Sequence, residues 1–306
     1  MLEVSDGHQL YWEEVGEPDG APALWLHGGP GSGLAAGHRR LVSRPGWRGV
    51  LFDQRGAGRS TPSAVDPATD LSVITTPKII EDIEALRVAR GVDSWTVVGG
   101  SWGCTLALAY AIAHPERVDG LCLLSVTTGD NDEIEWITRG VGRIFPEAWD
   151  EFVGHLPVSA REGNIATAYA ELLAAGDPEI RAAAAAAWCA WEDIHVSLAP
   201  GWEHWDRYDD PDFAFAFARQ VTHSWSHDCF LPPRHVLNNA SAIASPVEMI
   251  HGRHDVSGPV GIPWELLKAL PNGRLAVSEE AGHSGAGTVE LFNQAMNRLL
   301  ASGHRD

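Results

Sequence analysis

The 306-residue sequence has few cysteines and no leader-like segment. Its four cysteines include no CxxC pair and no metal-ligand spacing, so neither a disulfide framework nor a cysteine-bound metal is expected. They lie in apolar stretches, as buried free thiols do, and a reducing cytoplasm is the simplest location. The first 20 residues are acidic and lack the basic and apolar regions of a signal peptide.

Positive charge and long apolar runs are also scarce. Lys and Arg number 22 against 41 Asp and Glu, which gives a net charge of −19. Such a surface repels phosphate backbones and anionic membranes, so neither nucleic acid nor a membrane is an expected partner. No apolar run reaches the roughly 18–20 residues that a membrane span requires. The net charge instead fits a protein that acts on neutral or cationic small molecules. The apolar fraction of 44% is typical of a globular enzyme.

Strand-like and helix-like segments alternate at both ends of the chain, which predicts an α/β fold with a mostly parallel central sheet flanked by helices. We expect residues 1–126 and 241–306 to form this sheet domain. Residues 127–240 are rich in tryptophan and helical signals, including an alanine run at 182–187, and predict an inserted helical cap. The expected strands are Leu10–Val15, Ala23–His27, Gly49–Asp53, Trp95–Val98, Leu121–Val126, Pro246–Ile250 and Leu275–Val277. The expected helices of the sheet domain are Lys78–Arg90, Trp102–His114, Trp264–Leu270 and Val289–Leu300.

The strongest chemical signal is the pentapeptide Gly99-Gly100-Ser101-Trp102-Gly103. It follows the strand-like WTVV and precedes the helix-like CTLALAYAIA, the context in which a nucleophile elbow lifts a serine hydroxyl clear of a sheet. Glycines two residues before and two after the serine relieve crowding in that turn. The alternative is a glycine-rich connection with an incidental serine.

Two further residues complete a catalytic triad. A serine hydroxyl needs a base, and the base needs an orienting carboxylate. In the α/β-hydrolase fold these follow in the order Ser, Asp, His, each on a loop after a strand. Asp255 follows the strand-like PVEMIHG, and His283 follows LAVSEE. We therefore predict Ser101 as nucleophile, His283 as base and Asp255 as its orienting acid, in an α/β-hydrolase catalytic domain.

The segment His27-Gly28-Gly29-Pro30-Gly31 ends an early strand-like run. The logic of the fold places one oxyanion-hole N–H on Gly29 and the other on Trp102, the residue after the nucleophile. The alternative is a glycine-rich turn that binds no ligand.

The chain resembles the proline iminopeptidases, a family of α/β hydrolases. The resemblance rests on HGGPG at 27–31, DQRGAGRS at 53–60, TTPKIIEDIEALR at 75–87, GGSWGCTLALAYAIAHPERV at 99–118, HGRHD at 251–255 and AGHS at 281–284. It implies removal of an N-terminal proline or another small residue from a peptide or amide that carries a free amine. It implies no metal and no organic cofactor.

The resemblance also implies an amine-binding glutamate in a Trp-x-x-Trp-Glu stretch, which is Trp188-Cys189-Ala190-Trp191-Glu192 in this chain. Glu192 would bind the ammonium group, with Trp188 and Trp191 beside the aminoacyl group. The alternative is an exposed glutamate next to two core tryptophans. The family's second acid, in an Ala-Arg-x-Glu-x-His stretch, is replaced by Val221. Glu203, Asp206 and Asp228 are candidates to replace it.

Other interpretations stay open at this point. An amidase that removes an aminoacyl group from a bulky natural product, or an esterase, fits the same triad, and a non-catalytic ligand-binding protein is a third reading. His223 and His227 have a metal-capable spacing but lack a third ligand, so we expect no metal.

Overall fold

The structure is a computed structural model, and it describes residues 1–196, 198 and 202–303. Its centre is a seven-stranded sheet in the order β3-β5-β4-β6-β7-β8-β9, with a separate two-stranded sheet of β1 and β2. Only β3 runs antiparallel within the larger sheet, so the predicted mostly parallel sheet is confirmed. The strands are β1 Leu2–Glu3, β2 Gln9–Leu10, β3 Trp12–Gly16, β4 Ala21–Leu26, β5 Trp47–Phe52, β6 Trp95–Gly100, β7 Val118–Leu124, β8 Val247–Gly252 and β9 Gly273–Ser278.

The expected strand at Leu10–Val15 is divided in two. Tyr11 interrupts it, because its backbone N–H donates to Ser60 Oγ at 2.9 Å instead of to a neighbouring strand. Residues before the break pair with β1, and residues after it pair with β5. The periodicity of the sequence could not reveal this change of partner, since both halves keep the same strand pattern.

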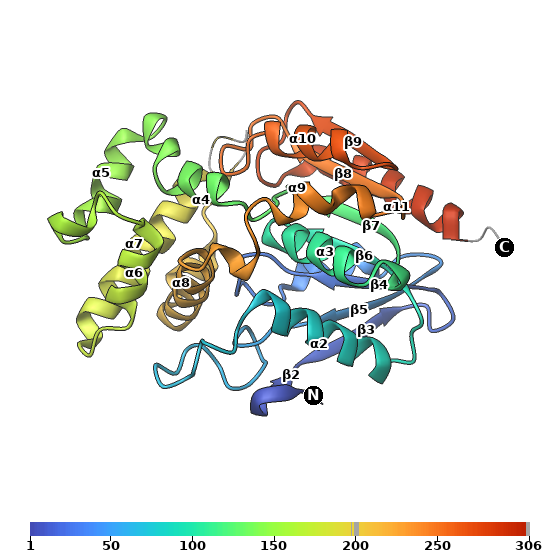
Figure 1. Cartoon of the computed structure of the whole chain (residues 1–306), viewed down its shortest axis with the longest axis horizontal. Coiled ribbons are helices and arrows are strands. Elements are labelled where there is room, and N and C mark those ends of the chain that lie inside the picture. Colours follow the sequence, from blue (N-terminus) through green and yellow to red (C-terminus); the bar gives the residue numbers. More distant parts are fainter. Residues whose placement is uncertain (197, 199–201, 304–306) are drawn as a thin grey trace.

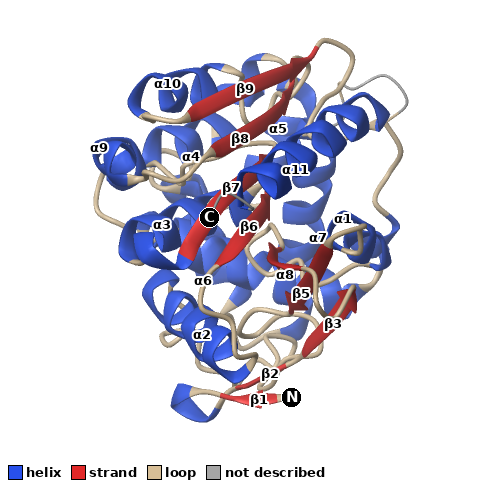
Figure 2. Ribbon diagram, turned by 90° about the vertical axis from the view of Figure 1, so that its right-hand side faces the viewer, coloured by secondary structure: helices blue, strands red, loops and turns tan. Residues whose placement is uncertain are grey.

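Helices cover both faces of the large sheet (Figure 2). On one face, α1 and α11 pack on a core that includes Val42, Phe292 and Met296. On the other face, α2, α3, α9 and α10 enclose a larger core that continues into the helical segment. These helices are α1 Arg39–Val42, α2 Thr76–Ala89, α3 Trp102–Ala113, α9 His235–Asn239, α10 Gly261–Ala269 and α11 Val289–Gly303.

Between β7 and β8 the chain forms a separate group of helices, α4 to α8, most of which lie to one side of the sheet (Figure 1). Acidic N-caps followed by proline start two of them: Asp177 accepts a hydrogen bond from Glu179 N before α7, and Asp210 caps α8. Helix α9, within the predicted cap segment, packs against α3 and α10. The bounds are α4 Asn131–Thr138, α5 Pro146–Gly154, α6 Ile165–Leu173, α7 Pro178–His195 and α8 Pro211–Trp225.

Short 3-10 helices connect these elements. They are η1 Ser5–Gly7, η2 Ala36–His38, η3 Pro115–Arg117, η4 Gly140–Arg143, η5 Val158–Ala160, η6 Asp206–Asp209, η7 Asp228–Phe230, η8 Ala240–Ala242 and η9 Ala286–Thr288. Across the described ranges, no helix has both the length and the apolar character needed to cross a bilayer.

Candidate active site

Ser101 stands at the sharp turn between β6 and α3. Its backbone adopts φ 56° and ψ −127°, a left-handed conformation that costs a non-glycine residue about 1–3 kcal/mol. The turn brings the strand and helix so close that a Cβ on Gly99 would lie 2.5 Å from the carbonyl oxygen of Gly103. A Cβ on Gly103 would lie 2.2 Å from the carbonyl oxygen of Leu26. The glycines at both positions are therefore required by close backbone contact.

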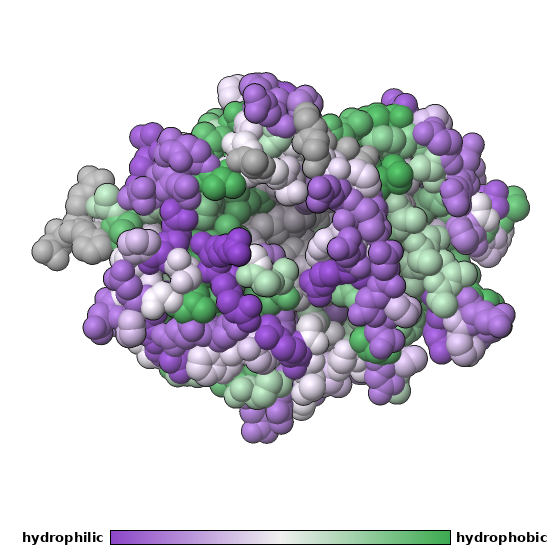
Figure 3. Space-filling view, turned by 180° about the vertical axis from the view of Figure 1, so that it is seen from behind, coloured by the Kyte–Doolittle hydropathy of each residue, from purple (hydrophilic) through white to green (hydrophobic). Residues whose placement is uncertain are grey.

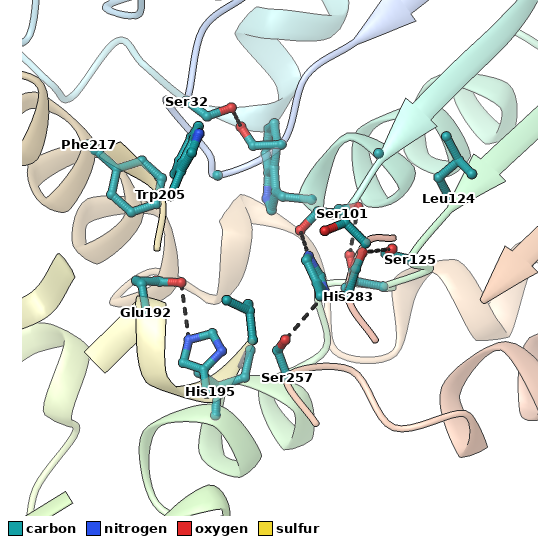
Figure 4. Close-up of a pocket in the computed structure, with 18 of the residues that line it drawn as sticks. Ser32, Ser101, Leu124, Ser125, Glu192, His195, Trp205, Phe217, Ser257 and His283 are labelled. Atoms are coloured by element: carbon teal, nitrogen blue, oxygen red, sulfur yellow. Dashed lines mark hydrogen bonds and ion pairs between the residues drawn. The ribbon is translucent and has the colours of Figure 1, made fainter. Parts of the chain in front are cut away.

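The structure brings together the three residues that the sequence analysis assigned to a triad. Figure 4 shows the contact between two of them, Ser101 and His283. His283 Nε2 lies 3.0 Å from Ser101 Oγ, and His283 Nδ1 lies 2.9 Å from Asp255 Oδ2. Asp255 follows β8 and His283 follows β9, so neighbouring parallel strands deliver both side chains to the same edge of the sheet. The carbonyl oxygen of His283 accepts a hydrogen bond from Ser125 Oγ, which anchors the loop after β9.

Burial and charge act in opposite directions on the acid and the imidazole. Burial raises the pKa of Asp255, but the adjacent His283 and the N–H of Gly258 more than offset it, and its pKa is lowered. Burial lowers the pKa of His283, but the charge and hydrogen bond of Asp255, with a smaller contribution from Glu192, leave that pKa raised. The pair therefore favours an ionised carboxylate beside an imidazole that accepts a proton readily.

The loop after β4 lies directly beside Ser101. A Cβ added to Gly28 would lie 3.0 Å from Ser101 Cβ, and Gly29 and Trp102 line the same cavity as Ser101. Trp102 begins α3, so its N–H belongs to the first turn, which has no intrahelical acceptors. His27 secures the loop, because its Nε2 accepts a hydrogen bond from Gln54 N at 3.0 Å. This arrangement suits a pair of N–H donors beside the serine.

Ser101 and His283 open into a cavity of about 430 Å³ between the sheet edge and the helical segment. A hollow is visible near the centre of the face in Figure 3, with hydrophilic residues along its rim. Among the described residues that line the cavity there is no lysine or arginine. Its carboxylates are Glu133, Glu192, Asp193 and Glu203, and its large aromatic side chains are Trp25, Trp102, Trp202, Trp205, Tyr208, Phe217 and Trp225. Such a cavity favours a cationic ligand with apolar parts.

Glu192 lies across the cavity from Ser101 and His283 (Figure 4). Its Oε1 accepts a hydrogen bond from Trp188 Nε1 at 3.0 Å. Trp188 and Trp191 themselves are buried behind the cavity wall, where Trp191 Nε1 donates to the carbonyl oxygen of Ile137. The contact that Trp188 makes is thus with the glutamate, and direct contact of either tryptophan with a substrate stays a prediction.

Comparison with known proteins shows the family of the chain. A family model described as the alpha/beta hydrolase fold matches residues 23–287. A probable proline iminopeptidase of Streptomyces coelicolor is 46% identical over 94% of this chain and 90% of its own length. A proline iminopeptidase of Arabidopsis thaliana is 42% identical over 98% of this chain and 80% of its own length.

The chain belongs to the proline iminopeptidase family of α/β hydrolases. Among solved structures, the proline iminopeptidase of Mycobacterium smegmatis superposes with a TM-score of 0.61 at 19% identity, covering 98% of this chain and 97% of that one. A putative aryl esterase of Burkholderia cenocepacia gives a TM-score of 0.66 at 16% identity, covering 99% and 98%. At such identities these two structures show the shared fold.

The structure shows where Val221 lies, the residue that the sequence analysis found at the position of the family's second acid. Val221 is fully buried on α8, between Phe217 and Trp225 on the same helix face. Val221 therefore supplies a buried apolar side chain at the position where the resemblance implies a carboxylate. Of the suggested replacements, Glu203 lines the cavity, whereas Asp206 and Asp228 are not among the described residues that do.

Three residues of the site escaped the sequence analysis. Ser257 Oγ donates to Asp255 Oδ1 at 3.1 Å and lies 3.3 Å from His283 Nδ1. Glu133 lines the cavity, and burial raises its pKa to about 7 against hydrogen bonds from Thr128 that lower it. His195 lines the cavity beside Glu192. The position of Ser257, two residues after the predicted acid, is the one sequence signal that could have led to any of them.

Proposed function

We propose that the protein is a serine hydrolase that removes an N-terminal proline or another small aminoacyl group from a peptide or amide. The observation that carries the proposal is the hydrogen-bonded series Ser101–His283–Asp255, which opens into a cavity that also contains Glu192. In this proposal residues 127–240 are a helical cap over the catalytic domain formed by 1–126 and 241–306. Four free, buried cysteines support a cytoplasmic location.

The reaction proceeds in two halves through an acyl-enzyme. His283 accepts the proton of Ser101 as Oγ attacks the aminoacyl carbonyl carbon, and Asp255 stabilises the resulting imidazolium. The N–H groups of Gly29 and Trp102 bind the oxyanion. His283 then protonates the leaving amine as the C–N bond breaks. In the second half His283 accepts a proton from water, which attacks the acyl-enzyme, and His283 returns a proton to Ser101 Oγ as the amino acid leaves. The reaction needs no cofactor.

The substrate's free amine binds Glu192 in this proposal, and the variant Glu192→Gln tests it. An ammonium–carboxylate hydrogen bond is about twice as strong as a neutral one, so we expect KM for a prolyl anilide to rise on the order of 10- to 100-fold. Hydrolysis of p-nitrophenyl acetate, which has no amine, should change less than about twofold. Glu179→Gln, an exposed glutamate on the same helix, is the matched control. An equal loss on both substrates would contradict an amine-binding role.

The pH dependence follows from the raised pKa of His283. The imidazole must be neutral to act as a base, so activity is lost as the pH falls through its pKa. Because that pKa is raised, the acidic limb of kcat/KM should have its midpoint above 6.5, the ordinary imidazole value. The measurement uses p-nitrophenyl acetate, since an uncharged ester does not depend on the amine site. A midpoint below 6.5 would show that Asp255 raises the pKa of His283 by less than burial lowers it.

The cavity volume favours a second candidate within the same chemistry. About 430 Å³ is in the range of sites for ligands much larger than one amino acid, which fits an amide with a bulky leaving group. A panel of prolyl, alanyl and N-acetylated substrates with small and large leaving amines separates the candidates. A requirement for the free amine supports an aminopeptidase or an aminoacyl amidase, and the preferred leaving amine decides between them. Indifference to the amine would favour an esterase.

A further inference from the structure

His195 is a buried histidine at the end of α7, in direct contact with Glu192. Its side chain lines the cavity, and the residue is 2% exposed. His195 Nε2 lies 3.1 Å from Glu192 Oε2 (Figure 4). The other carboxylate oxygen of Glu192 accepts a hydrogen bond from Trp188 Nε1. Within the described part of the chain, neither ring nitrogen has a partner in hydrogen-bond geometry. The contact with Glu192 is therefore mainly electrostatic, and its strength depends on whether the imidazole carries a proton.

We propose that His195 is a specificity-determining residue that sets the charge of the amine-binding site by competing with the substrate's ammonium group for Glu192. The inference rests on the proposed amine-binding role of Glu192. When His195 is neutral, the pair has a net charge of −1 and attracts an ammonium ion. When His195 is protonated, the pair is neutral overall and presents a cation next to the incoming cation.

Among the residues that the structure describes, those around the pair offer His195 no stronger partner than Glu192. The next acid on the helix, Asp193, is bound to His204 Nδ1 at 2.7 Å and to the N–H of Trp205. Other elements contribute Glu133 from α4, Glu203 and His38, together with His283 of the triad, to the cavity wall. Trp191 packs edge-on against the imidazole, with ring centroids 6.0 Å apart. Glu192 is thus the carboxylate in contact with His195.

Competition of this kind links ligand binding to proton release. If an ammonium ligand binds the unprotonated form of a site more tightly, binding must displace the proton, and the affinity must fall as the pH falls. Both effects come from the change in charge of one imidazole, so both should be lost when His195 is replaced. No other role of His195, such as packing, predicts proton release on binding.

The test is calorimetric titration of L-prolinamide into two proteins. Both carry Ser101→Ala, so that the ligand binds without turnover, and one of them also carries His195→Gln. Gln has a similar length but no charge, and His195→Asn serves as a second variant if the first unfolds. We expect affinity about tenfold weaker at pH 5.5 than at pH 7.5 with His195, and a change below about twofold with Gln. At pH 6.5, titrations in two buffers of different ionisation enthalpy should show proton release that the Gln protein lacks.

Each outcome decides the proposal. Proton release and pH dependence that are equal in the two proteins would trace both effects to another group, such as His283, and overturn the role of His195. Absence of L-prolinamide binding to every variant would overturn the amine site itself, and with it the proposed function. The difference between the two proteins, present only with His195, is the supporting result.

Discussion

Replacing Ser101 by alanine is expected to abolish hydrolysis of a prolyl anilide while the protein stays folded. Ser101 Oγ lies 3.0 Å from His283 Nε2, the position that the proposed nucleophile requires. Removal of a triad nucleophile leaves only binding and oxyanion stabilisation, so we expect kcat to fall by about 10⁵-fold or more. The measurement is single-turnover and steady-state kinetics with a prolyl anilide, together with labelling by a fluorophosphonate probe.

The control for this variant is Ser302→Ala, which removes a serine hydroxyl on α11 that bonds the carbonyl oxygen of Leu299. It should keep full activity and labelling. Alanine at 101 also relaxes no backbone strain, since it too disfavours φ 56°, so the thermal unfolding temperature should be close to that of the parent. Residual turnover above about 1% of the parent rate, or labelling without Ser101, would contradict the assignment of the nucleophile and favour a different reaction.

Asp255→Asn is expected to lower kcat by about 10³- to 10⁴-fold without unfolding the protein. Asp255 Oδ1 accepts hydrogen bonds from the N–H of Gly258 and from Ser257 Oγ, so the amide oxygen of Asn takes that position. The amide NH₂ is then directed at His283 Nδ1, which must become an acceptor. The ring proton moves to Nε2 and points at Ser101 Oγ, so the imidazole can no longer act as a base.

A control separates the effect on the tautomer of His283 from the effect of removing one negative charge from the protein. Asp119→Asn, at an exposed position on β7, should leave kcat unchanged. Because the amide is nearly the same size as the carboxylate, KM should stay within about threefold of the parent. A loss of activity that is mostly in KM, or a fall in kcat below about tenfold, would mean that Asp255 does not orient His283.

Family membership, the mostly parallel sheet and the meeting of Ser101, Asp255 and His283 at one edge of the sheet could all be anticipated from the sequence, because each depends on local patterns. The turn at Ser101 is a property of five consecutive residues, whose glycines are needed for contacts of 2.5 Å and less. Asp255 and His283 each follow a strand, and parallel strands end at one edge of a sheet. The order of strands and loops along the chain is therefore enough to predict that these residues meet.

The break at Tyr11 and the packing of Trp188 and Trp191 could not be anticipated in the same way. A period-two pattern does not say which strand a segment pairs with, and a tryptophan suits a cavity wall as well as a core. The structure places both indoles behind the cavity and directs the N–H of Trp188 to Glu192.

By itself, the sequence determined the family and pointed to the residues that would perform the chemistry, because motif spacing constrains the backbone where those residues stand. Only the tertiary structure decided what surrounds Glu192. The contact between Glu192 and His195 depends on side-chain directions at the end of one helix and on the helices packed against it. Charge at a binding site is set by such contacts in space, and separation along the chain does not report them.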